Sequence, residues 1–78
     1  MKSSKVVALD SPLRVSVIES FGDFVAGQDV VVDRVMVPKG FIGVQGENKF
    51  FPFSNADEVS RRGLAEIIIR FRKELRSN

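Results

Sequence analysis

The amino-acid sequence predicts an α+β domain: a small, strongly bent antiparallel sheet, or an SH3-like or OB-like open barrel of four to five strands, followed by one C-terminal amphipathic helix. Apolar residues before Ser54 mostly alternate with polar ones, as in strands. After Ser54 they recur at the spacing of one helix face. The 78 residues are expected to form a single domain over 1–78, β-rich at 6–54, with a modest core that dimerisation would supplement.

The first strands of the sheet are expected before residue 22. Residues 1–5 are polar and are expected to fray. Residues 6–9 form a short apolar run, and the Asp-Ser-Pro sequence at 10–12 is typical of a turn that ends it. Alternating aliphatic residues then predict a second strand over 13–21, because every other side chain of a strand points to the same face.

The middle of the chain contains the strongest strand signal. Residues 20–28 hold two glycines and are expected to form a long irregular connection, fixed to the core by Phe21 or Phe24. Valine-rich residues 29–37 predict a strand, with a Pro-Lys-Gly turn after it at 38–40.

Two shorter strands are expected before the helix. Residues 41–45 return along the preceding strand, 46–48 turn again, and 49–54 form a further strand. Pro52 cannot donate a backbone hydrogen bond, so this last strand is expected at an edge of the sheet.

The helix is expected over 55–76. Its start fits a capping pattern, in which Ser54 acts with Asp57 or Asn55 acts with Glu58. Its buried face is expected to carry the apolar residues at helical spacing, which are Leu64, Ile67, Ile68, Phe71 and Leu75.

The composition argues against several classes of function. The chain has no Cys and no His, which excludes disulfides and imidazole ligands and makes a zinc site improbable. No glycine motif of a nucleotide-binding loop is present, and the acidic residues are explained by turns and helix capping. We therefore expect no catalytic residue, no cofactor and no metal. No apolar run approaches the length of a membrane span, and a cytoplasmic location is expected.

Charge is concentrated on the helix. Residues 61–76 carry a net charge of +4, although the whole chain carries only +2. The surface opposite the apolar face is expected to hold Arg62, Ile69, Lys73 and Arg76, with Arg72 nearer its flank. Such a surface either stays in solvent, attracts phosphate, or contacts another protein around Ile69.

Phenylalanine is concentrated on the last two expected strands, at Phe41, Phe50, Phe51 and Phe53. Because Phe50 and Phe51 point to opposite faces of a strand, these rings cannot all enter one core. An exposed ring can stack on a base or anchor a protein interface. The alternative is that each ring packs within the sheet or under the helix.

Taken together, the residues favour a non-catalytic interaction module or regulator that binds another protein. The alternative is a nucleic-acid-binding protein that uses the basic helix and a Phe-bearing sheet, and an enzyme is the third reading. A homodimer is expected because the core is limited, and no membrane contact is expected. The candidate partner-binding residues are Arg62, Ile69, Arg72, Lys73, Arg76, Phe41 and Phe50.

Overall fold

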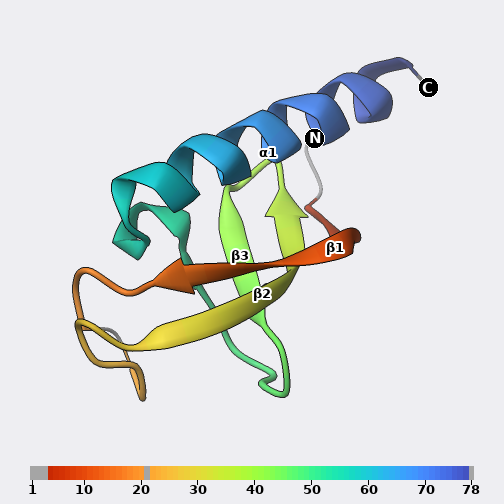
Figure 1. The fold of residues 1–78 in the computed structure, drawn as a ribbon. Coiled ribbons are helices and arrows are strands. Elements are labelled where there is room, and N and C mark those ends of the chain that lie inside the picture. Colours follow the sequence, from red (N-terminus) through yellow and green to blue (C-terminus); the bar gives the residue numbers. More distant parts are fainter. Residues whose placement is uncertain (1–3, 21, 78) are drawn as a thin grey trace.

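A computed structural model of the chain describes residues 4–20 and 22–77 (Figure 1). Four antiparallel strands form one open sheet in the order β1-β2-β3-β4, and a single helix lies across one face of it. This confirms the predicted fold class. The elements are β1 (Lys5–Ser16), β2 (Asp29–Val37), β3 (Phe41–Val44), β4 (Phe50–Pro52), the 3₁₀ helix η1 (Phe53–Asn55) and α1 (Glu58–Ser77).

A bulge of several residues interrupts β1 in its middle. Ala8 pairs with Arg34 and Leu13 pairs with Val32, so the four residues 9–12 lie opposite a single residue of β2. The Asp-Ser-Pro sequence at 10–12 therefore does not end a strand, and the two predicted strands are one strand that ends at Ser16. Extra residues on one side of a ladder bend and twist it, which gives the sheet its curvature.

A second bulge lies in β2 at Asp33. Val32 pairs with Val44 of β3. Two residues further on, Arg34 pairs with Gly43, the immediate neighbour of Val44. The unpaired extra residue reverses which alternate positions face the core. The buried positions accordingly change from even to odd along the strand, at Val30, Val32, Val35 and Val37.

Other predicted boundaries differ by a few residues. Lys5 already belongs to β1, where it pairs with Val37, whereas residues 1–3 of the expected frayed segment lie outside the described residues. The last strand covers only Phe50–Pro52, because the chain turns into η1 at Phe53. The predicted strand 29–37 agrees with β2.

Phe24 fixes the connection between β1 and β2. Its side chain is buried, and its ring centroid lies 5.1 Å from that of Phe51 in β4. Phe21, the other candidate for this role, lies outside the described residues. The connection is tied down again at its surface, where Lys49 Nζ donates to Asp23 Oδ2 at 2.8 Å.

The core lies between α1 and the inner face of the sheet. Leu64 and Ile68 of the helix are fully buried there. Ile67, Phe71 and Leu75, which the sequence also placed on the buried face, are only half-buried. Phe71 and Leu75 lie toward the end of the helix, beside the start of β1. The largest fully buried side chains of the sheet belong to Phe51, Ile42, Val15, Val32, Val35 and Val37.

Asp57 joins the start of the helix to the end of β1. Its backbone N–H donates to Ser16 O at 2.9 Å, and its Oδ2 accepts a hydrogen bond from Ser16 N at 3.0 Å. Its carboxylate also accepts from the backbone N and the Oγ of Ser60, both at 2.8 Å. Asp57 is thus the helix N-cap, and neither predicted capping pair forms, since η1 delays the helix to Glu58.

These hydrogen bonds act on the ionisation of Asp57. The backbone N–H groups of Ser60 and then Ser16, together with the Ser60 hydroxyl, lower the pKa of Asp57 from 3.8 to about 2. All of them donate to the charged form, so the ionised carboxylate is the form that the fold stabilises.

Truncation of an apolar side chain on the buried face of α1 should destabilise the fold more, the more completely that side chain is buried. Leu64→Ala should lower the free energy of unfolding by about 3 kcal/mol, because it leaves a cavity in the core. Phe71→Ala should cost about half as much, since solvent already reaches its ring. Urea denaturation measures both, with the exposed Ile69→Ala as the control. Equal losses at Leu64 and Phe71 would contradict this packing.

Stability should depend on pH through Asp57. Because its pKa is lower in the folded chain than in the unfolded chain, its contribution is complete above about pH 4 and is lost as the pH falls toward about 2. Asp57→Ala should lower the free energy of unfolding at pH 7 by about 2 kcal/mol. Asp57→Asn keeps a capping oxygen without the charge, so urea denaturation should show a smaller loss at pH 7 and a flatter acid dependence. If the acid dependence of the free energy of unfolding were unchanged in Asp57→Asn, a group other than Asp57 would be its cause.

Candidate functional site

An apolar row crosses all four strands on the face of the sheet opposite the helix. Val6 pairs with Met36, Met36 pairs with Phe41, and Phe41 pairs with Pro52. Residues directly opposite each other on neighbouring strands project to the same face. That face is the outer one, because Ile42, the next residue along β3, is fully buried in the core. Val6 is 49% exposed and Phe41 is 37% exposed.

A second row lies beside the first. Here Ala8 pairs with Arg34, Arg34 with Gly43, and Gly43 with Phe50. The Arg34 guanidinium lies over the Phe50 ring, 5.3 Å from its centroid. We refer to the apolar row with these two side chains as the outer patch, which comprises Val6, Arg34, Met36, Phe41, Phe50 and Pro52.

The Arg34 side chain is held in place rather than free to move. Its Nη2 donates to the carbonyl oxygens of Val44 at 3.2 Å and Glu47 at 2.6 Å, and its Nη1 lies 3.4 Å from Asp33 Oδ1. The guanidinium lies directly on Gly43: a Cβ atom there would be 2.4 Å from Arg34 Nε. Glycine at this position therefore provides the space that the arginine fills.

The far side of α1 carries the second set of predicted residues. The side chains of Arg62, Ile69, Lys73 and Arg76 are exposed, and we refer to these four residues as the basic stripe. Ile69 is 49% exposed. Arg72 is also exposed, but its Nη2 donates to the carbonyl oxygen of Pro38, so it ties the helix to the turn between β2 and β3.

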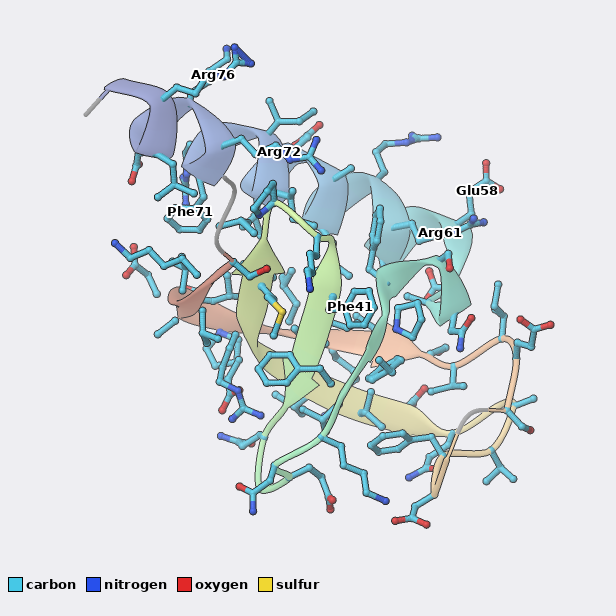
Figure 2. All side chains as sticks on the ribbon, turned by 180° about the vertical axis from the view of Figure 1, so that it is seen from behind. Phe41, Glu58, Arg61, Phe71, Arg72 and Arg76 are labelled. Carbon is cyan, nitrogen blue, oxygen red and sulfur yellow. The ribbon has the colours of Figure 1, made fainter. Side chains whose placement is uncertain are left out.

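The predicted residues therefore divide between two opposite surfaces. The helix contacts the inner face of the sheet through Leu64 and Ile68, and the basic stripe points away from that contact. Phe41 and Phe50 belong to the outer face of the same sheet. Figure 2 shows Arg76 projecting beyond the helix while Phe41 lies among the strands. One ligand cannot contact both surfaces without passing around the domain.

Four members of the outer patch were not among the candidate residues of the sequence analysis. Pro52 was considered there only as the sign of an edge strand. Val6 and Met36 look like ordinary strand residues, and only the register reveals that they continue the row of Phe41. Arg34 interrupts a run of valines, and that interruption was the available signal for a side chain on the outer face.

Among the described residues, no three His, Cys, Asp or Glu side chains are grouped so as to hold a metal ion. None of the described helices has the length and hydropathy needed to cross a membrane. Comparison with protein-family models, with curated proteins and with solved structures finds no match to this chain. Its function must therefore be inferred from its own surfaces.

Substitution of Gly43 should act through Arg34. Gly43→Ala should lower the free energy of unfolding by about 1 kcal/mol, because the new methyl group displaces the guanidinium from its two carbonyl acceptors. In an Arg34→Ala background the same change should cost nearly nothing. A double-mutant cycle in urea measures this coupling, and full additivity of the two losses would show that Gly43 is required for another reason.

Proposed function

We propose that the chain is a non-catalytic module that binds another protein through the outer patch. The observation that supports this most directly is the continuous row from Val6 to Pro52, which leaves apolar side chains of four strands in contact with water. Adjacent exposed apolar side chains on a small domain are typical of interaction sites. Phe, Met and Arg are also the residue types that are enriched in protein interfaces.

The geometry of Arg34 adds to this proposal. A guanidinium that already has two carbonyl acceptors loses little further freedom when a partner covers it. Its planar face lies over Phe50, so the two side chains present one continuous surface. Phe41, the more exposed ring, is the expected anchor of the interface.

Nucleic-acid binding through the basic stripe is the competing function. Arg62, Lys73 and Arg76 are exposed cations that can neutralise phosphates. However, the candidate rings Phe41 and Phe50 belong to the other side of the domain, so a nucleic acid on the basic stripe does not reach them without passing around the domain. A net charge of +2 is also weak for a phosphate-binding protein. The cytoplasmic location expected from the sequence stays a prediction.

A pair of matched variants tests the proposal. The immobilised chain is exposed to nuclease-treated lysate of its source, and retained proteins are identified by mass spectrometry and then titrated in purified form. Phe41→Ser should weaken binding by at least about thirtyfold, because it removes an anchor worth about 2 kcal/mol or more. Ile69→Ser removes an exposed apolar side chain from the basic stripe and should change affinity less than about threefold.

The same titration with a labelled oligonucleotide of arbitrary sequence tests the competing function, which is nucleic-acid binding. Near physiological ionic strength, about 0.15 M, no micromolar binding is expected. Micromolar binding that is abolished by Lys73→Glu with Arg76→Glu, and unaffected by Phe41→Ser, would overturn the proposal in favour of nucleic acid. Circular dichroism of each variant confirms that the fold is intact.

A further inference from the structure

The two edges of the sheet are protected very differently. β4 has only three residues and ends in Pro52, so it offers little backbone to another strand. The first half of β1 instead contains four consecutive apolar residues, 6–9, with no charge or proline among them. The bulge and Pro12 interrupt the strand further on, but this apolar stretch has no such protection and is a template for pairing with a further strand.

The register identifies which backbone groups face outward. Gly40 N donates to Met36 O, so the polar backbone groups of Met36 point toward β3. Val6, directly opposite Met36, therefore directs its own N–H and C=O away from β2, and Ala8 does the same two residues further on. At the other end of β1, the equivalent groups of Ser16 are bonded to Asp57. Asp57 thus covers one end of this edge, and among residues 4–20 and 22–77 no backbone hydrogen bond covers the outward groups of Val6 and Ala8.

A groove of about 310 Å³ runs alongside the open end, between the start of β1 and the last turns of α1. Val7, Phe71 and Leu75 provide apolar side chains to it. Lys5 on the strand and Glu74 on the helix also line it, so the groove carries one charge of each sign. Figure 1 shows the start of β1 beneath the C-terminal half of α1.

We propose that the strand that occupies this edge is β1 of a second copy of the chain, paired antiparallel about a two-fold axis near residues 6–8. A two-fold axis brings identical surfaces together, so a self-pairing surface must complement itself. The groove can meet this requirement, because it is lined by Lys5 and Glu74, and a two-fold axis would set Lys5 of each copy against Glu74 of the other. The half-buried Phe71 and Leu75 gain cover in the same contact.

This pairing has a structural consequence for the outer patch. The two sheets become one sheet of twice the number of strands, with Val6 of each copy at the junction. The apolar rows of both copies then lie side by side on one outer face. The pairing itself does not depend on what the outer patch binds, because it uses the strand edge and the groove.

Sedimentation equilibrium over a concentration series tests the proposal on the full chain. The wild type should approach twice the monomer mass of 8.7 kDa. Ala8→Pro removes an outward N–H without breaking a bond to β2, and should raise the dimer dissociation constant by at least about tenfold. A wild-type chain that remains near 8.7 kDa at every concentration would overturn the proposal.

A second test exchanges the charges of Lys5 and Glu74. It tests whether the two copies contact each other through these residues, even if Ala8→Pro disturbs the fold. Glu74→Lys and Lys5→Glu should each weaken self-association about tenfold, because each places like charges together at both ends of the interface. An equal mixture of the two variants restores opposite charges at both ends and should associate as tightly as the wild type. Glu66→Lys, the same change on the exposed side of the helix, is the control. Weakening by Glu66→Lys equal to that by Glu74→Lys, or a mixture that stays monomeric, would overturn the proposed pairing.

Discussion

The contact between Asp57 and the end of β1 determines where the helix lies, and the rest of the structure follows from it. The carboxylate accepts hydrogen bonds from both the last residue of β1 and the first turn of α1. The bridge between Val17 and Ala56 and the hydrogen bond from Ile18 N to Asn55 O hold the same junction. In the direction that the helix takes from this junction, Leu64 and Ile68 reach the inner face. The choice of inner face in turn leaves Phe41 and its neighbours on the outer one. The contact at the end of β1 thus contributes to which face of the sheet stays uncovered.

The bulge at Asp33 is the second constraint. Without the extra residue, the alternation that buries Val30 and Val32 would have turned Val35 outward and Arg34 into the core. The bulge instead brings Arg34 to the outer face opposite Gly43, where a missing side chain gives it room. The bulge thus places Arg34, the polar member of the outer patch, on the outer face. The regular alternation of β2 after the bulge then places Met36 on the same face.

The sequence was sufficient to predict that a sheet precedes one helix and which side of the helix faces the sheet. Both predictions rest on the periodicity of apolar residues, which is a local property of short segments. It located β2 and the positive-φ glycine of the turn after it, Gly40. It was insufficient for the bulges, since a strand of twelve residues and two short strands with a turn have the same local pattern. For the candidate site, it identified Phe41 and Ile69 separately. That they lie on opposite sides depends on register and helix direction, which are tertiary properties. Register likewise determines which further residues belong to the patch, namely Val6, Arg34, Met36 and Pro52.

The thickness of the domain makes its two surfaces electrically independent. The two shorter dimensions of the backbone are 22 and 20 Å, whereas the screening length of physiological salt is about 8 Å. The field of the basic stripe has therefore decayed strongly before it reaches Phe41 on the other side. A multivalent anion bound along Arg62 and Arg76 would leave the affinity of the outer patch for its proposed partner almost unchanged. Both surfaces can consequently be occupied at the same time, so that even a chain of 78 residues has room to bridge two molecules.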